Sequence, residues 1–421
     1  MTKHKSDQKS HHKNQPQPEK FNNWKKLYLL IGIIVVVIAI IFIWKSTDKR
    51  AVKNSETQTD IQQSKQLTGK PKPIEKWIVR AKAVDEQFHT VYTPCWEGAY
   101  GAIGDAYLFT VTKDSALLRF HTIEHDMRKM CEGTWVDDRA WICLAEFYWW
   151  DFTGRKNHSL IQDAKKRYDE ARNEGRLSNH NGYWSWYNWS PNANVQENIF
   201  TNSNMNQMMT VACCLYEATG ERHYLDDALL VWNGDKKFPG IEKILYKGDG
   251  KWEGKPGRAA FGNEVPWQGA GFCTIGAALY RVTKDPKYKK IVVETAKRIM
   301  DPANGWVDPY DFYQIQMDGN GAFVNFLLDA YAIAPDELQD IPPKIEKMLE
   351  HVWTNHHGAA SVTLHRETDH GIRNGWNPYG GEDGYGVDEV GTVHAQGEAA
   401  RAFGLFVYYL NLKEKNYSHV Q

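Results

Sequence analysis

Two adjacent aspartates, Asp137 and Asp138, precede an apolar helical pattern that begins with Ala140. Two like charges at the start of an apolar helix cost free energy, so such a pair suggests a functional role. Tryptophans stand on both sides, at Trp135 and Trp141. Paired carboxylates beside aromatic rings suit the cleavage of glycosidic bonds. The same dipeptide also fits a helix N-cap with a second acid favoured by the helix dipole, so the pair alone leaves both interpretations open.

The composition limits the class of protein. The chain has 421 residues and a formal net charge of −1, and this length allows one large domain or two medium ones. A charge near zero argues against a nucleic-acid partner, because nucleic-acid-binding domains are normally clearly basic. The 17 tryptophans exceed ordinary usage several-fold, and tyrosine is also frequent, with 21. Aromatic residues on this scale serve a large core, a carbohydrate platform or both.

The N-terminal part differs in composition from the rest. Residues 1–26 are rich in polar residues, so we expect a disordered tail. Residues 27–44 are an uninterrupted apolar run with aromatic residues at its ends, which predicts a transmembrane helix with the tail inside and the remaining chain outside. A cleaved signal peptide is the alternative, but the run is long and no small-x-small site follows it. Residues 45–73 are polar and end in Gly-Lys-Pro-Lys-Pro, which predicts a flexible linker.

The cysteines show no metal-ligand spacing, and we expect no resident metal or cofactor. Cys95 and Cys131 are able to pair outside the cytoplasm, but the sequence leaves this open. The other four lie in apolar helical segments, where buried free thiols are expected: Cys143, Cys213, Cys214 and Cys273.

A weak pattern recurs between residues 74 and 412. An apolar helix is followed by aromatic-x-x-Thr-(Gly/Lys)-(Asp/Glu) and then by a second helix, as at Thr112, Thr219 and Thr283. Each unit therefore reads as a helical hairpin with a long glycine- and aromatic-rich loop. Hairpins repeated around a circle predict an all-α fold, an α/α barrel or toroid whose inner helices line a cavity. An open solenoid is the alternative, but solenoid repeats are shorter and more regular. Residues 413–421 are expected to be a C-terminal tail.

Several motifs follow one another in this part of the chain: Thr93-Pro94-Cys95-Trp96-Glu97-Gly98, Val136-Asp137-Asp138-Arg139-Ala140-Trp141, Asn202-Ser203-Asn204-Met205-Asn206, Val265-Pro266-Trp267-Gln268-Gly269, Gly319-Asn320-Gly321-Ala322-Phe323-Val324 and His394-Ala395-Gln396-Gly397. In this order they resemble the motifs of glycoside hydrolase family 76, the endo-α-1,6-mannanases and their fungal cell-wall relatives. Trp267 and Asn320 depart from the family pattern, which usually has Asn and Lys at these places.

The resemblance implies an (α/α)6 barrel and retaining cleavage of α-1,6-mannosidic linkages, with Asp137 as nucleophile and Asp138 as general acid/base. Retaining glycosidases hold their two carboxyl groups about 5–5.5 Å apart. Successive helical residues point about 100° apart, which suits that spacing when both side chains enter one pocket. Desolvation by Trp135 and Trp141, with repulsion from Asp137, predicts a raised pKa for Asp138. The sequence does not show where Arg139 points.

Aromatic and amide side chains are the candidates for substrate binding. A tryptophan in a loop or at a helix start suits the floor of a sugar subsite, and core packing is the alternative for each. Asn204 and Gln268 are candidates for hydrogen bonds to mannose hydroxyl groups, with helix capping as the alternative. The tryptophan candidates are Trp96, Trp135, Trp184 and Trp267.

Together these patterns predict a membrane-anchored, single-pass glycosidase, with its barrel outside the cytoplasm, that acts on α-mannan or a mannose-containing oligosaccharide. We expect a monomer without a nucleic-acid partner. Transglycosylation through the same covalent intermediate is an alternative, and so is a non-catalytic glycan-binding protein. A sugar epimerase on the same type of barrel would need catalytic histidines on inner helices, and the sequence places few there.

Overall fold

The computed structural model describes residues 73–132, 136–173, 184, 202–237, 239–255, 258–259, 266–301, 320–356 and 393–418. The chain divides into two units, Met1–Pro71 and Lys72–Gln421, and every described residue belongs to the second. The predicted tail, membrane helix and linker therefore lie outside the described residues, apart from Pro73. Within the described ranges, no helix has both the length and the apolar character that a membrane crossing requires.

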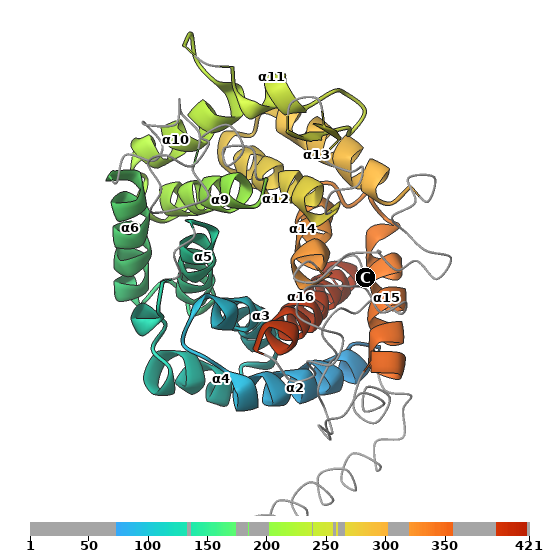
Figure 1. The fold of residues 1–421 in the computed structure, drawn as a ribbon. Coiled ribbons are helices and arrows are strands. Elements are labelled where there is room, and N and C mark those ends of the chain that lie inside the picture. Colours follow the sequence, from blue (N-terminus) through green and yellow to red (C-terminus); the bar gives the residue numbers. More distant parts are fainter. Residues whose placement is uncertain are drawn as a thin grey trace, which may run out of the picture. The chain divides into compact units, whose positions relative to one another are not determined.

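The described part of the second unit is built mainly of helices in two concentric layers (Figure 1). The inner layer consists of α3 (Trp96–Thr112), α5 (Val136–Phe152), α9 (Asn202–Thr219), α12 (Pro266–Thr283), α14 (Asn320–Ile333) and α16 (Val393–Ser418). The outer layer consists of α2 (Pro73–Val91), α4 (Ser115–Arg119), α6 (His158–Asn173), α10 (Arg222–Asn233), α13 (Pro286–Ile299) and α15 (Ile341–His356). Shorter elements are the π-helix η1 (Phe120–Glu124), the 3₁₀-helix η2 (Met127–Lys129) and α11 (Ile241–Leu245).

The inner helices form a closed ring. Each one contacts the next in chain order, and the last, α16, packs against the first, α3 (Figure 1). Two glycines bring α3 and α16 into close contact. A Cβ atom on Gly104 would lie 2.4 Å from the carbonyl oxygen of Ala400, and one on Gly404 would lie 2.3 Å from the carbonyl oxygen of Gly104. This closure confirms the predicted barrel and excludes the open solenoid, in which the first and last repeats do not meet.

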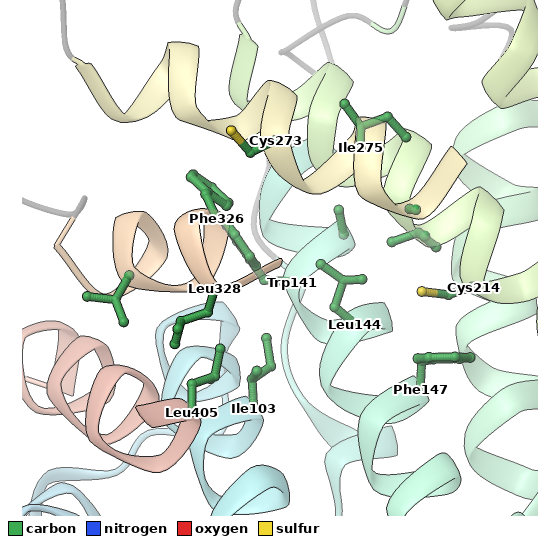
Figure 2. Packing of buried hydrophobic residues seen from close by; sticks show 14 of the residues in the cluster. Ile103, Trp141, Leu144, Phe147, Cys214, Cys273, Ile275, Phe326, Leu328 and Leu405 are labelled. Carbon is green, nitrogen blue, oxygen red and sulfur yellow. The ribbon is translucent and has the colours of Figure 1, made fainter. Parts of the chain in front are cut away.

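Burial distinguishes the two layers. Every residue of α3 from Gly98 to Leu108 is buried, whereas α13 buries mainly one stripe that includes Tyr288 and Ile291. A helix buried on all sides belongs inside a domain, and a helix with one apolar stripe covers it. Figure 2 shows part of the core between the inner helices, with labelled side chains that include Ile103, Trp141, Cys214, Ile275, Phe326 and Leu405.

The recurring threonine pattern is the turn from an inner to an outer helix. The Thr283 hydroxyl donates to the Leu279 carbonyl (2.7 Å) and accepts from the Asp285 N–H (3.2 Å). Lys284 adopts a left-handed conformation (φ 60°), which ends the helix. The Asp285 carboxylate then caps α13 by accepting from the Lys287 N–H (3.0 Å). The same hydroxyl-to-carbonyl bond is made by Thr112, Thr153 and Thr219.

The C-terminal helix extends beyond the predicted end of the domain. α16 continues to Ser418, whereas residues 413–421 were expected to be a tail. Leu412 still packs against the core, and residues 413–418 contain no Gly or Pro to end the helix. A small antiparallel hairpin, β1 (Glu253–Lys255) and β2 (Arg258–Ala259), forms in the glycine- and aromatic-rich segment before α12.

Candidate active site

A small cavity lies inside the inner ring, with a volume of about 10 Å³. It is lined by residues of α5, α9, α12, α14 and α16, namely Trp141, Leu144, Tyr148, Gln207, Thr210, Thr274, Asn325, Phe326 and Arg401. Each of these residues follows the start of its helix by between one and about three turns. The five helices therefore begin at the same end of the ring.

The aspartate pair occupies the first turn of α5, at this end of the ring. Asp138 is only 4% exposed, and Arg139 after it is also buried. The side chains of α5 that line the cavity begin at Trp141, one helical turn after position 137. Position 137 therefore lies on the helical face that leads into the cavity. The free backbone N–H groups of a first helical turn favour negative charge, which suits an ionised carboxylate here.

The structure shows where Arg139 points. Its Nη2 lies 3.0 Å from an oxygen of Glu132, and the other oxygen of Glu132 lies 2.6 Å from Nη1 of Arg167. Arg167, on α6, also pairs with Asp163 at 2.8 Å. Glu132 thus joins two buried arginines and links the start of α5 to the outer helix beside it. Such a network fixes the direction of the helix start and compensates the charge next to Asp138.

A disulfide fastens the segment before α5. Cys95 and Cys131 are bonded, and the Cys131 N–H donates to the carbonyl of Pro94 at 2.7 Å. This settles the pairing that the sequence left open, and it ties the start of α3, where Trp96 lies, to the segment that precedes the aspartates. The other four cysteines are buried free thiols, as predicted: Cys143, Cys213, Cys214 and Cys273.

A buried polar chain lies beside the cavity. The guanidinium group of Arg401, a residue that is 1% exposed, stands 4.4 Å from the centre of the Trp141 ring and donates to the Asn325 side-chain oxygen at 3.0 Å. Asn325 donates to Asp329 at 2.9 Å, and the Thr274 hydroxyl donates to the same oxygen at 2.7 Å. Burial raises the pKa of Asp329 to about 6, against the opposing effects of Thr274 and of nearby arginines.

Sequence reasoning missed this chain. Asn325 and Asp329 stand in Phe-Val-Asn-Phe-Leu-Leu-Asp, and Arg401 stands in Ala-Ala-Arg-Ala-Phe. The signal that indicates such residues is a single polar residue within an apolar helical segment, because burial of a polar group without a partner costs free energy.

Several predicted substrate-binding residues lie at the same end of the ring as the aspartates. Trp96 is the first residue of α3 and is partly buried. Asn204 lies in the first turn of α9, and Trp267 and Gln268 lie in the first turn of α12. The backbone thus places these four positions at one end of the ring. The side chains of Asn204, Trp267 and Gln268 lie outside the described part. Trp135 is also outside the described residues.

Trp184 corrects one prediction. It was expected to line a sugar subsite, but it is 1% exposed and packs edge-on against Tyr168 of α6, with ring centroids 5.4 Å apart. A buried ring has no face open to a sugar. In this structure Trp184 is therefore a core residue, which is the alternative that the sequence had left open.

Comparisons with known proteins identify the fold. No protein-family model and no curated protein matches the chain. A family 76 glycoside hydrolase (mannosidase) from Bacteroides thetaiotaomicron VPI-5482 matches with a TM-score of 0.59 and 16% identity, over 81% of this chain and 100% of that one. An inactive variant of the α-1,6-mannanase from Salegentibacter sp. HEL1_6, with two consecutive aspartates replaced by alanine, was solved in complex with alpha-1,6-mannotetrose. It matches with a TM-score of 0.58 and 14% identity, over 78% and 99% of the two chains.

The chain has the fold of glycoside hydrolase family 76. The structural likeness agrees with the resemblance of the sequence motifs to this family. A polysaccharide lyase also matches, with a TM-score of 0.54 and 14% identity, over 81% of this chain and 99% of that one. Because the barrel supports more than one reaction, the residues of the site must decide the chemistry.

Proposed function

We propose that this protein is a retaining glycoside hydrolase that cleaves α-1,6-mannosidic linkages, with Asp137 as nucleophile and Asp138 as general acid/base. The observation that carries the proposal is the position of the pair, in the first turn of an inner helix, at the end of the ring where the cavity-lining helices begin. A solved mannanase of the same fold, inactive when two consecutive aspartates are replaced, supports it.

The surroundings of the pair suit two different roles. The first turn of α5 offers a positive dipole end, which stabilises an ionised nucleophile. Burial of Asp138 limits its contact with water, which favours a carboxyl group that keeps its proton until the leaving oxygen takes it. The pairing of Arg139 with Glu132 compensates the adjacent positive charge.

The reaction then proceeds in two displacements. The Asp137 carboxylate attacks the anomeric carbon, the bond to the glycosidic oxygen breaks, and Asp138 gives its proton to that oxygen. Asp138, now ionised, takes a proton from water, whose oxygen attacks the same carbon and releases Asp137. Two inversions give a product with the original α configuration. A second sugar in place of water would give transglycosylation.

The test uses the full chain in mild detergent with linear α-1,6-mannan as substrate, and α-1,2- and α-1,3-linked mannobiose as controls. Chromatography should show short mannooligosaccharides from the α-1,6 polymer alone. Longer products from added oligosaccharides would identify the transferase instead. No cleavage of any of the three by the folded protein would overturn the proposed activity.

We also propose that residues 27–44 anchor the barrel at the outer face of a membrane. The apolar run supports the anchor, and the Cys95–Cys131 disulfide supports an oxidising compartment, since such bonds persist outside the cytoplasm. Protease added to intact cells should then release a fragment that contains the barrel. A chain that becomes cleavable only after cell lysis would contradict this orientation.

A further inference from the structure

A second group of chemically active side chains lies away from the aspartate pair. Asp85 and His89 stand one turn apart on the outer helix α2, Asp105 stands on the inner helix α3, and His121 stands on the π-helix η1. Asp105 is 1% exposed, His121 is 0% exposed and Asp85 is 5% exposed. Four ionisable side chains from three elements therefore lie close together between the outer and inner layers. Burial of charged groups costs free energy unless a partner compensates them.

The ligand-type atoms of the group converge. Nε2 of His89 and Nε2 of His121 lie 2.9 Å and 2.5 Å from the same oxygen, Oδ2 of Asp105. Oδ1 of Asp85 lies 3.1 Å from Nε2 of His89. His89, Asp105 and His121 each offer one nitrogen or oxygen, and these three atoms lie within 4.8 Å of one another. Ligands held about 2.0–2.1 Å from a tetrahedral Zn²⁺ stand roughly 3.3 Å apart, so small shifts would place this set around one ion.

The charges of the group also suit a cation. Among the described residues, the two histidines are the only basic side chains within ion-pair distance of Asp85 and Asp105. A divalent ion with two carboxylates and two neutral imidazoles would be neutral overall, without shared protons.

The local structure holds the two rings in place. The Phe120 ring stacks on His89, with centroids 3.6 Å apart and planes at 5°, and His121 packs against Trp149 with centroids 5.2 Å apart. His121 is supplied by a π-helix, a rare conformation that is frequent at functional sites. Nδ1 of His121 has no hydrogen-bond partner among the described residues. Since such outer partners typically strengthen metal binding about 10–100-fold, a moderate affinity is expected.

We propose that His89, Asp105 and His121 form a structural binding site for a divalent transition-metal ion, with Asp85, 3.1 Å from His89, as the fourth ligand after a small shift. The chemistry of the donors favours Zn²⁺, and the site would fasten α2 and η1 to α3. Two imidazoles and two carboxylates form a four-ligand set of the kind that zinc accepts. The site would hold the outer layer to the inner ring rather than take part in the chemistry at the aspartate pair.

The test measures metal binding by the full chain, purified in mild detergent with an affinity tag that contains no histidine. The protein is stripped with a chelator, titrated with Zn²⁺ alone, and followed by metal analysis after gel filtration and by thermal unfolding. His89→Gln and Asp105→Asn remove one ligand each, and His89 is partly exposed, so its variant should fold. His125→Gln is the matched control, since His125 lies beside Tyr92 and outside the ligand set. The histidines at residues 4, 11 and 12 remain in every protein.

The wild type and His125→Gln should retain about one Zn²⁺ per chain and unfold at a higher temperature with it. His89→Gln and Asp105→Asn should bind at least about 10-fold more weakly and lose the thermal shift. With Co²⁺ in place of Zn²⁺, the wild type should show the visible absorption of four-coordinate cobalt. The two ligand variants should not show it. Folded wild-type protein without bound metal or thermal shift would overturn the site and leave a proton-sharing cluster. Equal binding by the ligand variants would overturn it too.

Discussion

Substitution of Gly104 by alanine tests the closure of the inner ring. The new Cβ would lie 2.4 Å from the Ala400 carbonyl oxygen, 2.5 Å from the carbonyl carbon and 2.5 Å from the Arg401 nitrogen. All three are backbone atoms of α16, so no side chain is able to turn away. Ordinary contact begins near 3.4 Å, and α3 and α16 must therefore separate by about 1 Å, which forfeits roughly a quarter to a half of the dispersion energy at the seam.

The expected size of the effect follows from two opposing contributions. Overpacking of a well-packed contact costs about 1–3 kcal/mol or more. Alanine in a helix interior is better than glycine by roughly 1 kcal/mol. Because all three contacts are with backbone, we expect the upper end of this cost, so that Gly104→Ala lowers the free energy of unfolding by up to about 2 kcal/mol. Gly276→Ala on α12 is the comparison variant, because its Cβ would meet a methyl group of Val292 at 2.5 Å rather than the backbone of a neighbouring helix.

The assay is urea unfolding followed by circular dichroism, with Gly404→Ala and the double variant included. A Cβ on Gly404 would strike the backbone of Gly104, so both methyl groups force apart the same contact. The double variant should therefore lose less stability than the sum of the two single changes. If Gly104→Ala unfolds at the same urea concentration as the wild type or a higher one, the backbone contact does not close the ring as described.

Three further changes test other parts of the structure. Asp329 has a pKa of about 6 in the folded protein, against an ordinary value of 3.8, so the folded state binds a proton more tightly than the unfolded state. The wild type should therefore lose up to about 3 kcal/mol of stability as the pH rises from about 4 to 6. Unfolding measured across this pH range should show no such loss in Asp329→Asn. Cys131→Ser removes the disulfide to Cys95, which closes a loop with a sequence separation of 36 residues, and should lower the free energy of unfolding by about 4 kcal/mol. A reductant should lower the stability of the wild type by the same amount and should have no further effect on the variant. Trp184→Phe should change the KM for mannan less than about twofold, because the ring lies in the core, and a rise of tenfold or more would return Trp184 to a subsite.

The sequence predicts the helical hairpins because their signals are local. The Thr283-Lys284-Asp285 turn contains its hydroxyl-to-carbonyl bond, its left-handed residue and its helix cap within a few positions. Closure of the ring is not local. It depends on contact between Gly104 and Gly404, which are 300 positions apart in the sequence, and a glycine within an apolar helix gives no sign of its partner. The long and irregular repeats favoured a closed barrel over an open solenoid, and the resemblance to a known family agreed with that prediction.

The candidate site shows the same division. Asp137 and Asp138 were selected as candidates from their chemical type and from the apolar helix after them. The chain of Arg401, Asn325 and Asp329 was missed because it forms only when α14 and α16 lie side by side.

Trp184 was misplaced because its loop sequence, Gly-Tyr-Trp-Ser-Trp-Tyr, has no period that separates a core ring from an exposed one. The cluster around Asp105 was also missed. Its members stand on three elements without a motif spacing, so only the folded chain brings them together.

The most direct test of the central claim compares the wild type with Asp137→Asn and Asp138→Asn on linear α-1,6-mannan. Asp151→Asn, at the other end of α5, is the matched control. NMR should show α-configured products from the wild type and the control, and turnover at least about 100-fold lower in both site variants, all with unchanged circular dichroism. Near-wild-type turnover in either folded site variant, or products of β configuration, would contradict the proposed roles of Asp137 and Asp138.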